Sequence, residues 1–77
     1  MELVKVVSRI DSISYFAGSI DIILSDDFLK LSYRPANKDM YNKLDKLDEF
    51  VLWEWTYFKN SNEIYKCKVL KNSYYNV

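Results

Sequence analysis

The sequence predicts a single α+β domain, an antiparallel sheet of five or six strands with one helix packed on one face. Several short segments alternate hydrophobic and polar residues, as strands with one wetter face do. Residues 38–49 instead repeat hydrophobic residues at helical spacing. A chain of 77 residues has room for one domain, residues 1–77, in which we expect residues 71–77 to form a flexible tail.

The first strand is predicted over residues 2–8, which are rich in valine. Residues 12–16 either continue this strand or form a second short one. A helix over residues 3–16 is an alternative, because hydrophobic residues also recur there at helical spacing. The β-branched residues in this segment favour strands.

Residues 19–24 and 28–34 predict a hairpin. Gly18 lies in the turn before it, where a positive φ costs glycine little. The polar residues of segment 25–27 predict the turn between the two strands. We expect six side chains of this hairpin to face the core: Ile20, Ile22, Leu24, Leu29, Leu31 and Tyr33.

The helix is predicted to begin after Pro35, with Asn37 as its N-cap. Its hydrophobic stripe consists of Met40, Leu44, Leu47 and Val51. Acidic side chains near a helix C-terminus oppose the macrodipole, at about 0.3–1 kcal/mol each. Either the helix therefore ends by Leu47, or the acids beyond it serve another purpose.

Residues 50–58 contain both tryptophans and predict a strand that the other elements surround. Val51, Trp53, Trp55 and Tyr57 share one face, which we expect to be core; an aromatic binding platform is the alternative. Residues 63–70 predict the last strand. We expect Tyr65, Cys67 and Val69 to face inward and Lys66 and Lys68 to face outward.

The composition argues against an enzyme. Without histidine, the chain lacks the commonest general base and metal ligand. One glycine cannot make a phosphate-binding loop, and the carboxylates lack calcium-loop spacing. We therefore expect no catalytic residue, no metal and no cofactor. Cys67 is the only cysteine, which favours a structural role in a reducing cytoplasm, and neither a signal peptide nor a membrane span is expected.

Two segments resemble known families. The first, residues 7–44, is similar in spacing to the small KTSC-type domains: SRIDSISY resembles their opening strand, and LSYRPANKDMYNKL resembles their strand-to-helix segment. This resemblance implies the order strand, hairpin, helix. The Val-Pro pair and the Lys-Thr-Ser-Cys-like segment of that family are absent here. The second, MELVKVV, resembles the start of the Dmd antitoxins of T-even phages, which inhibit a host RNase toxin, and this resemblance implies a phage protein that binds a host protein.

These observations favour a small, non-catalytic protein-binding domain, a phage-type inhibitor that blocks a host or defence protein by occupying its surface. The expected contacts are the acids at the helix end and the residues on the far side of the aromatic strand, namely Asp45, Asp48, Glu49, Glu54, Phe58 and Lys59. The net charge of zero disfavours nucleic acid, yet residues 59–77 carry four lysines and one glutamate. A single-stranded nucleic-acid-binding module that uses this C-terminal hairpin is therefore an alternative, as is a structural homo-oligomer such as a homodimer.

Overall fold

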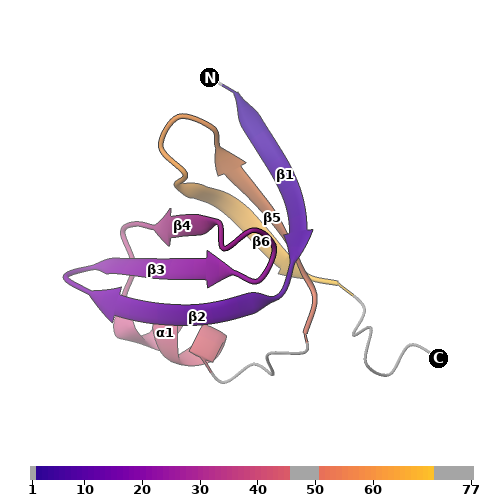
Figure 1. The fold of residues 1–77 in the computed structure, drawn as a ribbon. Coiled ribbons are helices and arrows are strands. Elements are labelled where there is room, and N and C mark those ends of the chain that lie inside the picture. Colours follow the sequence, from indigo (N-terminus) through magenta and orange to yellow (C-terminus); the bar gives the residue numbers. More distant parts are fainter. Residues whose placement is uncertain (1, 46–50, 71–77) are drawn as a thin grey trace.

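The computed structural model describes residues 2–45, without the side chain of Asp45, and residues 51–70 (Figure 1). These residues form an α+β domain, which confirms the predicted class. The elements in chain order are β1 (Leu3–Ser8), β2 (Ile10–Phe16), β3 (Ser19–Leu24), β4 (Lys30–Tyr33), α1 (Lys38–Asp45), β5 (Trp53–Phe58) and β6 (Ile64–Val69). Within the described residues, no helix is both long and apolar enough to cross a membrane.

The six strands form two antiparallel sheets of three strands, in the orders β1-β5-β6 and β2-β3-β4. The expected single sheet is therefore divided, and the division lies at Arg9. Before Arg9 the chain pairs with β5, and after it the chain pairs with β3, with an irregular register between Ile10 and Ser12. Two hydrogen bonds hold this corner: Ser25 N donates to the Arg9 carbonyl at 2.8 Å, and Asp26 N donates to Ser8 Oγ at 3.0 Å.

The core contains side chains from both sheets. Its buried members are Ile20, Ile22, Leu24, Leu31, Val51, Trp53, Trp55 and Ile64. The tryptophans therefore belong to the core, as the alternation of residues 50–58 predicted. Trp55 is completely buried, and its Nε1–H donates to the Ser8 carbonyl at 3.1 Å, so the indole satisfies its one polar group inside the core.

The turn and the helix start follow the local predictions. Ala17 and Gly18 both have positive φ, 50° and 77°, in the two-residue turn between β2 and β3. Asn37 caps α1, because its Oδ1 accepts the Met40 N–H at 2.9 Å. The helix packs beside β2, where the rings of Tyr15 and Tyr41 lie 5.9 Å apart. Residues 46–49 of the predicted helix lie outside the described residues.

The last strand differs from its prediction. Cys67 is half-buried, as expected, but Tyr65 and Val69 are exposed and Ile64 is buried instead. Val69 pairs with Trp53, as its predicted inward direction requires, yet it is 48% exposed. The change at Tyr65 and Ile64 has its reason in an irregular register, in which Thr56 pairs with Lys66 and Tyr57 with Ile64, so that β6 has one extra residue at Tyr65. The extra residue turns the tyrosine ring to the outer side, against Phe58.

Candidate functional site

The described residues offer little for covalent or metal chemistry. They contain no group of three histidine, cysteine, aspartate or glutamate side chains that could hold a metal ion. Burial raises the pKa of the Cys67 thiol. Because the thiolate is the reactive form, this shift makes Cys67 a weaker nucleophile at neutral pH than an exposed cysteine.

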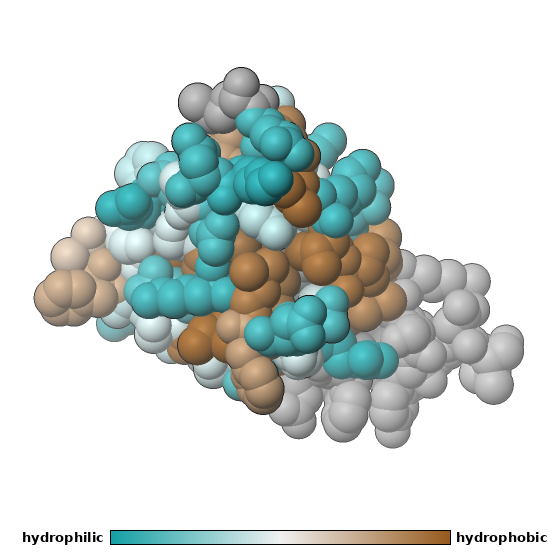
Figure 2. Space-filling model, turned by 45° about the horizontal axis from the view of Figure 1, so that its top comes forward, coloured by the Kyte–Doolittle hydropathy of each residue, from teal (hydrophilic) through white to brown (hydrophobic). Residues whose placement is uncertain are grey.

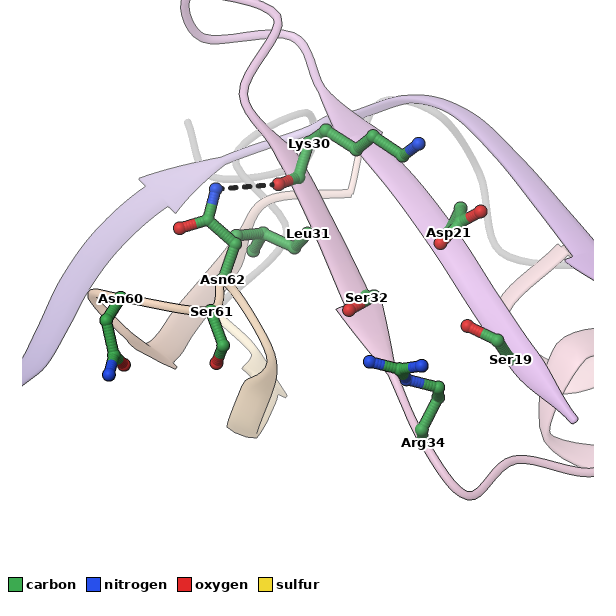
Figure 3. Close-up of a pocket in the computed structure, with 9 residues that line it drawn as sticks. All are labelled: Ser19, Asp21, Lys30, Leu31, Ser32, Arg34, Asn60, Ser61 and Asn62. Carbon is green, nitrogen blue, oxygen red and sulfur yellow. Dashed lines mark hydrogen bonds between the residues drawn. The ribbon is translucent and has the colours of Figure 1, made fainter.

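A polar depression of about 590 Å³ lies over β4 (Figure 3). It is lined by Ser19, Asp21, Lys30, Leu31, Ser32, Arg34, Asn60, Ser61 and Asn62. The contacts here connect the two sheets: Ser32 N donates to the Asn62 carbonyl at 3.0 Å, Asn62 Nδ2 donates to the Lys30 carbonyl at 3.1 Å, and Arg34 pairs with Glu63 at 2.9 Å. The loop between β5 and β6 thus covers the edge of β4, and we interpret this depression as structural.

A more apolar depression of about 430 Å³ lies between α1 and β6. Met40 and Leu44 line it from the helix, and Ile64 and Cys67 line it from the strand. These four residues also belong to the hydrophobic core or pack against it. We therefore interpret this depression as an opening in the core packing.

The outer face of the sheet β1-β5-β6 is a further candidate. Strand pairing arranges its residues in rows across the sheet. Leu3 pairs with Phe58 in the first row. In the second row Thr56 pairs with Lys5 on one side and Lys66 on the other, and in the third row Glu54 pairs with Val7 and Lys68 in the same way. Tyr65 completes the first row, because its ring contacts that of Phe58 edge to face at a centroid distance of 5.7 Å. We call this surface the lysine–tyrosine face. It consists of Leu3, Lys5, Val7, Glu54, Thr56, Phe58, Tyr65, Lys66 and Lys68.

Hydrophobic groups on this face are exposed beside positive charge. Leu3 and Val7 are each 45% exposed, and Tyr65 is 56% exposed. Two of the three lysines on this face flank its one acid, since Lys5 Nζ lies 3.9 Å and Lys68 Nζ 3.7 Å from Glu54 Oε1. Lys30, by contrast, lies on β4 in the other sheet, so that reversing its charge leaves the lysine–tyrosine face unchanged. Figure 2 shows one face of the molecule, on which hydrophobic side chains are gathered between hydrophilic ones.

The structure brings together part of the predicted contact set. Glu54 and Phe58 lie on the lysine–tyrosine face, and Lys59 lies just beyond its end, 3.7 Å from the Glu2 carboxylate. Asp48, Glu49 and the side chain of Asp45 lie outside the described residues. The sequence did not predict Leu3, Lys5 and Val7 as part of this surface, because the pairing of β1 with β5 joins segments about fifty residues apart and no local pattern indicates it.

Comparisons with protein-family models, with curated proteins and with solved structures gave no match to this chain. The resemblances to the KTSC-type domains and to the Dmd antitoxins therefore stay predictions. The function must be inferred from the residues themselves.

Proposed function

We propose that this protein is a small, non-catalytic binding domain that inhibits another protein by occupying its surface through the lysine–tyrosine face. The observation that carries the proposal is the exposure of Leu3, Val7 and Tyr65 on one side of one sheet. Exposed hydrophobic groups with a polar surround are characteristic of protein-binding surfaces. Tyrosine adds a large apolar ring with a hydroxyl at its tip, a combination enriched at interfaces.

The charge of the face defines the partner further. Lys5, Lys66 and Lys68 outnumber Glu54, so the partner surface is expected to be acidic, since complementary charge guides association. We propose a host or defence protein as the target, and a phage as the source, on the basis of the resemblance of MELVKVV to the Dmd antitoxins. The cytoplasm of the host cell would be the place of action.

Affinity capture with matched variants tests this proposal. Tyr65→Asp should abolish capture of a host protein that the wild-type chain retains, because it places a charge in the hydrophobic row. Lys66→Glu should weaken the same capture. Lys30→Glu, the same charge reversal on the other sheet, should leave it unchanged. Equal capture by the wild type and Tyr65→Asp would contradict the proposal.

Single-stranded nucleic acid is a second candidate ligand for the same face. The observation in its favour is that Lys5 and Lys66 lie across the sheet from each other, beside the exposed ring of Tyr65. Aromatic side chains stack on bases, and lysines track the backbone. Such binding should weaken steeply with salt. Fluorescence anisotropy with a labelled oligonucleotide distinguishes the candidates, because an absence of binding at low salt removes this one.

A further inference from the structure

The free edge of β1 is a feature that the lysine–tyrosine face does not explain. The Lys59 N–H donates to the Glu2 carbonyl at 3.0 Å, so the even-numbered residues of this segment direct their backbone groups toward β5. Backbone groups alternate in direction along an antiparallel strand. The N–H and C=O groups of Leu3, Lys5 and Val7 therefore point away from β5, and no hydrogen bond from the described residues reaches them.

β4 and β2 have neighbours of their own, whereas β6, the other edge of this sheet, is bridged within the described residues only at its start, by Ser32 and Glu63. The loop before β6 donates and accepts hydrogen bonds along β4 through Asn62, as described above. α1 lies beside β2 (Figure 1), and the ring of Tyr41 contacts that of Tyr15. Within the part of the chain that the structure describes, no loop or helix forms a hydrogen bond with the outward backbone groups of Leu3, Lys5 and Val7. An edge of this kind is a template for another strand.

We infer that the free edge of β1 receives an extended, acidic segment of the partner protein as an additional antiparallel strand. This inference rests on the proposed protein-binding function and specifies how the partner is held. Main-chain hydrogen bonds to Leu3, Lys5 and Val7 would supply affinity, and the alternate side chains would supply specificity.

The side chains of β1 define the sequence of that segment. On the lysine–tyrosine face, an incoming strand lies next to Leu3, Lys5 and Val7 in turn, so an acidic residue belongs opposite Lys5 and hydrophobic residues belong opposite the other two. On the opposite side of the sheet it lies next to Val4 and Val6, which are half-buried. The expected segment is therefore one acidic residue with two hydrophobic residues on each side.

A second copy of this chain fits the edge less well. The β1 strands of two copies could pair with each other about a two-fold axis. All three outward residues, Leu3, Lys5 and Val7, take part in this pairing only when the axis passes through Lys5. That register places the lysines of the two copies directly opposite each other, and like charges at paired positions are destabilising. Lysine in an edge strand is also a common obstacle to self-association.

The probe for this inference is the synthetic peptide TVVEVVT, and its matched control is TVVKVVT. Titration of the isotopically labelled protein should shift the amide signals of Leu3, Lys5 and Val7 in nuclear magnetic resonance spectra, and the acidic peptide should bind about fivefold more tightly than the control. Lys5→Glu should reverse this preference. Lys30→Glu should leave it unchanged.

Lys5→Pro tests the backbone directly. The Lys5 N–H is not part of the pairing with β5, and proline is accepted on strand edges, so this variant removes a donor for the incoming strand without removing one from the sheet. It should lose peptide binding. If it fails to fold, the reversed preference of Lys5→Glu decides the question alone.

Three results obtained with the protein and the peptides would overturn the inference. They are slow hydrogen exchange of the Leu3, Lys5 and Val7 amides in the free monomer, a dimer whose formation slows that exchange, and peptide binding that leaves those amides unchanged. Capture of a host protein by the wild type, Lys5→Pro and Lys5→Glu but not by Tyr65→Asp would refute strand addition at the edge of β1. That result would leave the proposed binding function intact.

Discussion

Ser8→Ala should destabilise the domain far more than the loss of one hydroxyl group from an exposed strand would. Ser8 is only 4% exposed, at the corner where the two sheets separate. Its Oγ accepts the Asp26 N–H at 3.0 Å and donates to the Arg9 carbonyl at 2.9 Å. The Arg9 carbonyl keeps a second donor, the Ser25 N–H at 2.8 Å, so the substitution leaves only the Asp26 N–H without its partner.

The magnitude follows from that one unpaired donor. A buried donor without a partner costs about 1–3 kcal/mol, and because Asp26 itself is exposed, water can partly replace the lost acceptor. We therefore expect the free energy of unfolding to fall by about 1–2 kcal/mol. A domain of this size is stable by about 4–11 kcal/mol, so the variant should still fold.

Urea denaturation followed by tryptophan fluorescence measures this effect. With a denaturant slope of about 1 kcal/mol per molar urea, the midpoint should fall by about 1–2 M. Ser14→Ala is the matched control, because Ser14 is an exposed serine on β2 and its substitution should change stability by no more than about 0.5 kcal/mol. Equal midpoints for the two variants would show that the corner hydroxyl does not hold the sheets together.

Three further predictions concern the core, the β2–β3 turn and the thiol. Trp53→Ala should lower the free energy of unfolding, measured by urea denaturation, by about 3–5 kcal/mol, because it removes a side chain that is only 5% exposed. A variant as stable as the wild type would contradict the assignment of Trp53 to the core. Gly18→Ala should lower the free energy of unfolding by about 1–2 kcal/mol, because φ at this position is +77°, a conformation that alanine rarely adopts. The new Cβ itself would meet no obstacle, since it would lie 3.8 Å from the Ala36 carbonyl oxygen. An unchanged thermal midpoint would refute this prediction. Burial raises the pKa of the Cys67 thiol, so the folded state holds the thiol proton more tightly than the unfolded state does. The stability that this proton contributes is complete at pH values below the ordinary thiol pKa. It is lost as the pH rises through the pKa of the thiol in the folded state. Wild-type stability should therefore fall more than that of Cys67→Ala as the pH is raised into this alkaline range, and parallel profiles would show that burial does not shift the titration.

The features that the sequence predicted correctly are those that depend on neighbouring residues. The cap at Asn37 needs an amide oxygen within reach of an N–H three residues away, and the turn at Gly18 needs a residue that tolerates positive φ. The alternation of Trp53 and Trp55 places both rings on one side of any strand, whatever its partners are. Local chemistry is enough to predict these features.

The features that the sequence did not predict depend on distant partners. The separation into two sheets arises where Arg9 and Ser8 bond to the β3–β4 loop, and nothing within residues 9–11 indicates that contact. The extra residue at Tyr65 depends on how β6 fits against β5. It reversed the expected direction of Tyr65 and so added an exposed ring to the candidate binding surface. The prediction of the site was therefore incomplete for the same reason as the prediction of the sheet.

Alternate residues of strand β5 face the hydrophobic core and the proposed binding surface. Trp53 and Trp55 face the core, whereas Glu54 and Phe58 face outward between β1 and β6. Substitutions of the outward residues should therefore change binding with little effect on folding. Thr56 is the exception, because it also faces outward but is 6% exposed. Its neighbours across the sheet are Lys5 and Lys66, and lysine stems cover apolar surface while their ammonium groups stay in water. A larger residue at position 56 would displace both lysines, so its effect on binding would report their placement rather than a contact of its own.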